Sequence, residues 1–296
     1  MKKKLFIYIS ASLLSSQLYA QPGWIFEREI TVDCCPEGGR LTKFDVSFSG
    51  DIYAIDQNEN RLLKLSKNGR VEKWIGGFGW RKEQFDTPSD IWVTGLDIFV
   101  SDKNNHRIQR FDMELNYIST LEGDNESADV EFEYPSSVAQ SQRGNVYVAD
   151  PVNGKVIKFS GDGQFLLEFG GIGYGRGRLI EPVSIAVSLN EKVLIADIGK
   201  NQILEYDEFG NFLGILGEGL QYEPSIVAAA ETGEILVLDE ENMTLYSIEK
   251  DGRGYSKIEL PEYEMGFMSP IDLAVRGNKL YILDSNEKRI ITFVHR

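Results

Sequence analysis

The sequence of 296 residues contains only two cysteines, two histidines and nine prolines. Two His and two Cys cannot supply a three-histidine zinc site or a framework of disulfides. Basic residues are also scarce, because 31 Lys and Arg stand against 46 Asp and Glu, which gives a net charge of −15. This balance argues against nucleic acid as a main partner, since phosphate binding needs a basic face. No Gly-x-Ser-x-Gly nucleophile motif occurs either.

The first twenty residues have the order of a secretory signal peptide. Three lysines at positions 2–4 precede an apolar run at residues 5–14, and Ala20 suits cleavage before Gln21. This run is too short to span a bilayer, although an uncleaved anchor is the rival interpretation. The short basic start is typical of bacterial signals, so we expect cleavage of residues 1–20 and a periplasmic or secreted protein. The mature chain would keep 28 basic and 46 acidic residues, a net charge of −18, and no later segment is apolar enough for membrane insertion.

Residues 21–296 consist of six sequence repeats of one unit. Each unit contains a short apolar strand that ends in an aspartate, and the successive aspartates are 46, 48, 47, 42 and 45 residues apart. These aspartates are Asp56, Asp102, Asp150, Asp197, Asp239 and Asp284. A proline precedes the aspartate by 14 or 15 residues in five units, and we align Lys43 with that proline in the first unit. Such a regular period indicates a repeat architecture.

Each unit divides into four short strands with glycine-containing turns between them. Glycine is abundant, with 29 residues, and turn sequences such as Lys67-Asn-Gly69 separate the strands. A period near 45 with four strands per repeat predicts an all-β, six-bladed β-propeller of four-stranded antiparallel blades, forming a single domain over residues 21–296. The sixth unit has only three strands, whereas one strand is spare at residues 24–30. We therefore expect the N-terminal strand to close the ring as the outer strand of the last blade, which also hides an exposed edge.

Two stretches of the sequence resemble a known repeat family. Residues 135–165, with Asn145-Val-Tyr-Val-Ala-Asp150 at their centre, and residues 85–111, with Asp102-Lys-Asn-Asn-His-Arg-Ile-Gln-Arg-Phe111, are similar to NHL repeats. The resemblance extends over residues 24–294, and the last two units depart from it, since Thr244 and Leu245 replace the usual Arg and Ile or Val. It implies a six-bladed propeller that binds protein or RNA, while related six-bladed folds include lyases and lactonases.

Two sets of aspartates could form a site. The six strand-final aspartates recur identically in every unit, so we expect each to accept backbone N–H groups in its own turn. The second set is irregular: two residues beyond the proline position lie Asp45, Asp90 and Asp272, in units that become neighbours when the ring closes. Three converging carboxylates at the mouth of the central channel would suit Ca²⁺. Loop capping by the same side chains is the alternative.

The loops between units supply the candidates for partner binding. Residues 76–82 and 170–178 are rich in glycine and carry Trp80, Tyr174, Arg176 and Arg178, residue types that are enriched at binding hot spots. A phosphate-binding loop at residues 170–178 is disfavoured, because no helix follows it. We expect these four side chains to lie on the face that carries the loops entering the first strand of each blade, where propellers bind partners.

The remaining cysteines and histidines carry less information. Cys34 and Cys35 are adjacent, so they either stay as thiols, form bridges between molecules, or close a strained ring with each other. His106 occupies a turn beside Arg107, where we expect a structural role.

The sequence therefore predicts an exported, monomeric propeller that holds a protein, peptide or glycan on its loop face without catalysis. The alternative is a Ca²⁺-dependent hydrolase, similar to lactonases, or a lyase with its site at the channel mouth.

Overall fold

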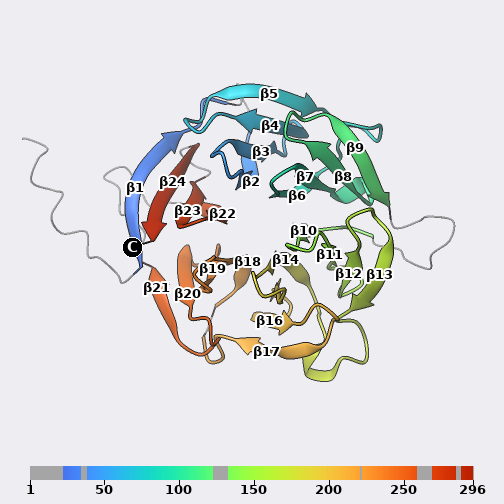
Figure 1. The fold of residues 1–296 in the computed structure, drawn as a ribbon, viewed down its shortest axis with the longest axis vertical. Helices are drawn as coiled ribbons and strands as arrows, with labels where there is room; N and C mark the ends of the chain where they lie inside the picture. Colours follow the sequence, from blue (N-terminus) through green and yellow to red (C-terminus); the bar gives the residue numbers. More distant parts are fainter. Residues whose placement is uncertain are drawn as a thin grey trace, which may run out of the picture.

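The computed structural model describes residues 23–34, 39–122, 133–220, 222–258, 269–284 and 288–295. The expected signal peptide at residues 1–20 and Cys35 lie outside these ranges. Six four-stranded antiparallel sheets are arranged as blades around a central channel (Figure 1). This confirms the predicted all-β, six-bladed propeller.

The blades follow one another along the chain. Blade 1 contains β2 (Leu41–Val46), β3 (Ile52–Asp56), β4 (Arg61–Leu65) and β5 (Val71–Gly76). Blade 2 contains β6 (Pro88–Val93), β7 (Asp97–Asp102), β8 (Arg107–Asp112) and β9 (Tyr117–Glu122), and blade 3 contains β10 (Ser137–Gln140), β11 (Val146–Asp150), β12 (Lys155–Phe159) and β13 (Phe165–Phe169). Blade 4 contains β14 (Pro182–Val187), β15 (Val193–Asp197), β16 (Gln202–Tyr206) and β17 (Phe212–Leu216), and blade 5 contains β18 (Pro224–Ala229), β19 (Ile235–Asp239), β20 (Thr244–Ile248) and β21 (Tyr255–Ile258).

Blade 6 joins the two ends of the described chain. It consists of β22 (Pro270–Arg276), β23 (Lys279–Asp284) and β24 (Arg289–His295), with β1 (Trp24–Thr31) as its outer strand. β1 runs antiparallel to β24, with Trp24 opposite His295 and Ile30 opposite Ile290, and Figure 1 shows the blue strand beside the red one. The predicted closure of the ring by the N-terminal strand is confirmed.

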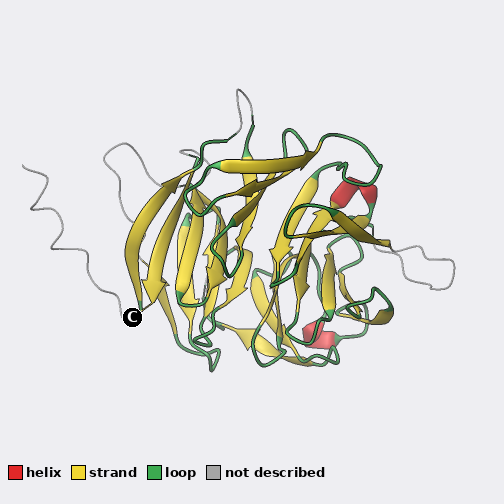
Figure 2. Ribbon diagram, turned by 45° about the horizontal axis from the view of Figure 1, so that its top comes forward, coloured by secondary structure: helices red, strands yellow, loops and turns green. Residues whose placement is uncertain are grey.

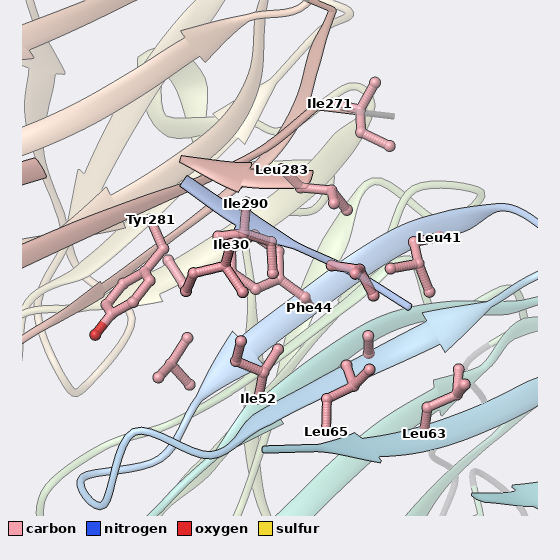
Figure 3. Close-up of a cluster of buried hydrophobic side chains, with 14 residues drawn as sticks. Ile30, Leu41, Phe44, Ile52, Leu63, Leu65, Ile271, Tyr281, Leu283 and Ile290 are labelled. Carbon is pink, nitrogen blue, oxygen red and sulfur yellow. The ribbon is translucent and has the colours of Figure 1, made fainter. Parts of the chain in front are cut away.

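Burial is greatest in the second strand of each blade and least in the outer strand. The second strands of blades 1 to 5 are buried along their whole length, in keeping with their continuous apolar runs. The outer strands, such as β5 and β13, expose most of their side chains. Among the described residues the buried apolar side chains form six clusters, each at the seam between two neighbouring blades. Figure 3 shows the cluster at the seam of blades 6 and 1, where Ile30 and Ile290 meet Phe44 and Ile52.

The antiparallel order gives the propeller two different faces. The connections between blades and the turns between second and third strands lie on one face, which we call the loop face; the two other turns of each blade lie on the opposite face, the turn face. Two short 3-10 helices, η1 (Lys103–Asn105) and η2 (Gly175–Gly177), belong to the loop face and are red in Figure 2. The described residues include no helix that is long and apolar enough to cross a membrane.

Candidate functional site: the channel and the loop face

The six strand-final aspartates stabilise the architecture of the blades. Asp102 accepts a hydrogen bond from the backbone N–H of Asp86 at 2.8 Å, and Asp197 accepts from Ile180 and Glu181 at 2.7 and 3.1 Å. The same bond, from the loop that enters the aspartate's own blade, recurs in the other four blades. The expected N–H from the aspartate's own turn is confirmed for Asp56, Asp150 and Asp239, whereas the bond common to all six blades comes from the entering loop.

The channel is lined by a second ring of side chains, and its members differ from the predicted set. In blade 2, Asp90 lies opposite Ser101, the residue before the strand-final aspartate, and Asp272 lies opposite Leu283 in the same way. In blade 1 the corresponding residue, opposite Ile55, is Lys43, while Asp45 lies two residues farther along the strand. The channel ring therefore consists of Lys43, Asp90, Ser137, Ser184, Ile226 and Asp272.

The alignment that grouped Asp45 with Asp90 and Asp272 is thus wrong by two residues. Leu41, not Lys43, lies where the other blades have proline, opposite the strand-final Asp56. A β-bulge follows this position in blade 1 as it does after Pro88 and Pro270. The described residues contain no group of three or more His, Cys, Asp or Glu side chains that could hold a metal ion. A calcium ion at the channel mouth stays a prediction, and Lys43 supplies a positive charge at the place assigned to it.

Lys43 lies between the two carboxylates of the ring. Its ammonium donates to Asp272 Oδ1 at 3.2 Å, and its charge also acts on Asp90. Burial raises the pKa of Asp272 to about 7, with Asp90 adding to the rise and Lys43 opposing it. Burial likewise raises the pKa of Asp90, again against the pull of Lys43. For Lys43 itself burial lowers the pKa, but the two carboxylates outweigh that effect and the net shift is upward.

Four of the six ring side chains also link their blade to the next by a hydrogen bond. Asp272 accepts the backbone N–H of Phe44 at 2.8 Å, Asp90 accepts that of Val138 at 3.0 Å, and Ser137 Oγ accepts that of Ile185 at 3.1 Å. Ser184 Oγ repeats the bond with Val227 at 3.2 Å. Ile226, the fifth member, has no polar atom with which to do so. The channel ring thus works as a set of interblade latches.

Asp45 takes part in a separate ion pair that joins three blades. The Arg276 guanidinium of blade 6 contacts both Asp45 oxygens at 2.9 and 3.0 Å, and it donates to the carbonyl groups of Val46 and Val93 at 2.6 and 3.0 Å. Asp45 also accepts the N–H of Val93 at 2.7 Å. Burial raises the pKa of Asp45, and Arg276 is the largest opposing influence. The three predicted carboxylates Asp45, Asp90 and Asp272 all line the space left in the channel, together with Arg276. This space is about 70 Å³, enough for a few water molecules.

The predicted binding residues are exposed on the loop face. Trp80 is 74% exposed in the connection between blades 1 and 2, while Tyr174, Arg176 and Arg178 are exposed in the connection between blades 3 and 4. Each connection is held by its carbonyl groups: Arg107 donates to the carbonyl of Trp80, and Lys200 donates to those of Arg176 and Arg178. The structure therefore brings three of the four together and leaves Trp80 on a separate loop.

A groove of about 570 Å³ lies on the same face, between those two connections. It is formed by blades 2, 3 and 4, and its lining residues are Lys103, Asn104, Tyr134, Pro151, Val152, Ile180 and Glu181. His106 supports one wall, because its ring packs 4.8 Å from that of Tyr134 and its Nδ1 lies 2.7 Å from the carbonyl of Glu133. The structural role expected for His106 is confirmed. We call this feature the loop-face groove.

Exposed large apolar side chains are concentrated on the half of the loop face that carries the loop-face groove, and Tyr134, Val152 and Ile180 among them line it. On the half of the loop face that spans the connections from blade 1 to blade 4, they are Phe78, Trp80, Tyr134, Val152, Ile172, Tyr174 and Ile180. Among the described residues on the other half of this face, Met243 is the exposed large apolar side chain, and it is accompanied by Glu223, Glu240 and Glu241. Contiguous exposed apolar surface marks interaction sites.

Sequence reasoning missed the groove residues, although two of them carry a signal. Val152 lies two residues after a strand-final aspartate, where Asn58, Asn104 and Glu241 occupy the same turn position in other blades. Tyr134 is likewise an aromatic residue directly before proline, where other blades have Thr87 or Glu181. A large apolar residue in a repeat position that is otherwise polar points to a role outside the architecture.

The class defined by this geometry is the six-bladed β-propeller. Two solved structures share the fold: catalytically inactive virginiamycin B lyase from Staphylococcus aureus with quinupristin, at 9% identity and a TM-score of 0.66, and a streptogramin B lyase, at 12% identity and 0.62. The alignments cover 90% and 93% of this chain and 99% and 98% of those chains. At this identity the likeness shows the fold alone.

Within that class, residues 85–111 match the NHL repeat model. Similar curated proteins include NHL repeat-containing protein 2 of Gallus gallus, 31% identical over 41% of this chain and 18% of that protein, and the protein brain tumor of Drosophila melanogaster, 27% identical over 41% and 12%. NHL repeat-containing protein 3 of Mus musculus is 21% identical over 68% of this chain and 62% of its own. The chain is thus a six-bladed propeller that contains an NHL-repeat match in blade 2 and is similar to NHL-repeat proteins, and it spans less than a fifth of the first two relatives.

Proposed function

We propose that this protein is an exported, monomeric binding module that holds a protein, peptide or glycan on its loop face without catalysis. The observation that carries the proposal is the loop-face groove, which is lined by the exposed side chains of Tyr134, Val152 and Ile180 and lies on the half of the face that has the most exposed apolar side chains. Its volume falls in the range of ligand sites, which are concave and largely apolar. NHL-repeat propellers commonly mediate protein binding, and this chain has an NHL-repeat match and relatives named as NHL repeat-containing proteins.

Export and the exclusion of nucleic acid are parts of the same proposal. The pattern of residues 2–20 supports export, and a mature net charge of −18 disfavours contact with phosphate backbones and anionic lipid. The polar channel residues favour binding over chemistry, because Asp45, Asp90 and Asp272 are engaged in latches and ion pairs that hold the blades together. The hydrolase or lyase alternative would need these groups for substrate.

A comparative pull-down tests the proposal. The native envelope fraction is passed over the immobilised mature protein, over the double variant Trp80→Asp/Val152→Asp on the loop face, and over Phe209→Asp as a control. Phe209 lies in a turn on the opposite face and is 69% exposed, similar to Trp80 at 74%. We expect partners that bind the parent and Phe209→Asp but not the double variant. Equal capture by all three proteins would contradict a loop-face site.

A further inference from the structure

We infer that the loop-face groove takes a peptide segment that presents a large apolar side chain next to an acidic one, with the acidic residue at the blade 2 end. This inference rests on the proposed function and specifies the chemistry of its partner. It depends on the composition of the groove along its length and on the state of the cations beside it.

The middle of the groove is apolar. Tyr134 comes from the connection between blades 2 and 3, Pro151 and Val152 from the turn of blade 3, and Ile180 from the connection to blade 4. Val152 is 56% exposed although the side chain is aliphatic. A cavity of about 570 Å³ accommodates more than one large side chain, so an aromatic or aliphatic anchor in the middle of a short segment fits it.

The two ends of the groove differ in charge. Lys103 lies at the blade 2 end and Glu181 at the blade 4 end, with the blade 3 turn between them. Within the described part of the chain, no carboxylate pairs with the Lys103 ammonium. An anionic group at the Lys103 end gains a favourable contact, whereas the same group beside Glu181 is repelled, so the groove sets the direction of an acidic ligand.

Several other surface cations are already engaged in ion pairs, whereas Lys103, within the described structure, is not. Lys64, Arg143, Lys155, Lys192 and Lys279 each form an ion pair with a glutamate at 2.6 to 2.7 Å. In a protein with 15 more acidic than basic residues, internal partners for a lysine are abundant. A lysine that lines a groove and has no such partner in the described structure is available to a carboxylate from another molecule. Charge complementarity thus favours an acidic segment as the occupant.

Neighbouring groups keep the cations in place. Asn104 donates to Asp86 Oδ1 and to Thr87 Oγ1, both at 2.9 Å, which holds the turn that carries Lys103. Lys200 donates to the carbonyl groups of Arg176 and Arg178 at 2.8 and 2.9 Å, which holds the loop at the other end. A ligand therefore meets a site whose backbone is already ordered, and this lowers the entropy lost on binding.

A random twelve-residue phage-displayed peptide library, panned on the mature parent protein, provides the probe. We expect the enriched peptides to carry Asp or Glu within a few positions of Trp, Phe or Leu. Synthetic copies are then titrated against the parent, Val152→Asp, Lys103→Glu and the turn-face control Phe209→Asp. We expect a loss of affinity of about tenfold or more for the first two variants, no change for the control, and weaker binding at high salt.

A charge exchange makes the test specific. Replacing the acidic residue of the peptide by lysine should weaken binding to the parent and restore it to Lys103→Glu, while melting curves report that every variant is folded. If Val152→Asp weakens binding and Lys103→Glu does not, the acidic preference is wrong and the proposed function stands. If Phe209→Asp alone weakens binding, the loop-face function itself fails. Enrichment of no peptide, or stronger binding of oligo(dT) than of any peptide, overturns the inference.

Discussion

Two neighbouring seams of the ring solve the same packing problem by different means. At the seam of blades 6 and 1, Asp272 reaches across to Lys43 and to the Phe44 N–H, and Arg276 pairs with Asp45. At the seam of blades 5 and 6 the channel-ring residue is Ile226, which packs in an apolar cluster with Leu238 and Leu273. The first seam is held by charge and hydrogen bonds in addition to its apolar cluster, and the second depends on apolar contact at the equivalent point.

The comparison shows that a buried ion pair is one solution among others for the interior of a propeller. Taking Lys43 and Asp272 out of water costs free energy that their attraction offsets only in part, and an apolar pair of similar volume is often as stable. The stability of the charged seam is more sensitive to substitution, because removing one partner leaves the other buried and unpaired. We therefore expect the charged seam to respond to single substitutions and to pH far more than the apolar seam does.

The largest effect is expected from removal of the strand that completes blade 6. Deleting residues 24–30 removes the buried side chains of Trp24 and Ile30 and uncovers the edge of β24 next to Ile290. An exposed strand edge with apolar neighbours pairs with other chains. We expect aggregation or loss of the cooperative melting transition, measured by light scattering and circular dichroism. A truncated protein that stays monomeric and melts like the parent would contradict the closure argument.

A smaller but still large effect is expected from Asp272→Ala. This change leaves the Lys43 ammonium and the Phe44 N–H without their buried acceptor, and loss of one member of a buried pair costs about 3–5 kcal/mol. The double variant Lys43→Met/Asp272→Leu copies the apolar solution of Ile226, and we expect it to recover much of that loss. Chemical denaturation of the parent and the two variants measures the difference. A double variant less stable than Asp272→Ala would show that the two seams are not interchangeable.

The pH dependence sharpens the same comparison. The pKa of Asp272 is raised to about 7 in the folded protein from its ordinary value of 3.8, so between about pH 4 and pH 7 the folded state binds more protons at this site than the unfolded state. The stabilising contribution of this proton is full below pH 4 and is lost as the pH rises through 7. We expect the melting temperature of the parent to fall between pH 5 and pH 8 by more than that of Asp272→Asn. Ile226→Val in the apolar seam should keep the pH dependence of the parent.

Much of this architecture could be predicted from the sequence because it repeats. The apolar runs that end in Asp56, Asp102 and their equivalents set the number of blades, and the spare strand at residues 24–30 set the closure. The alignment failed where a repeat lost its marker: Leu41 replaces proline in blade 1, so counting from Lys43 placed Asp45 in the channel ring.

The loop-face groove could not be predicted in the same way. Lys103, Val152 and Ile180 come from three different blades, and their proximity depends on how the blades are arranged in space rather than on any local pattern. Periodicity predicts the features that all blades share. A binding site depends on the residues in which the blades differ, and in the sequence this difference is visible at Tyr134 and Val152, which are apolar at repeat positions where other blades are not.

The smallest effect is expected from calcium. A site built on Asp90 and Asp272 would have to displace Lys43, which already supplies a positive charge between them. We therefore expect the melting temperature of the parent to be the same in calcium and in EDTA. In Lys43→Met the two carboxylates keep their repulsion without a resident cation, so calcium should stabilise this variant, and Asp90→Asn in the same background should abolish the response. A true site occupied at a hundredfold excess over its dissociation constant stabilises the fold by about 2.7 kcal/mol, a shift of about 5 °C for a chain of this size. A shift of that order in the parent, lost in Asp90→Asn, would establish the calcium site and return the channel mouth to consideration as a place for chemistry.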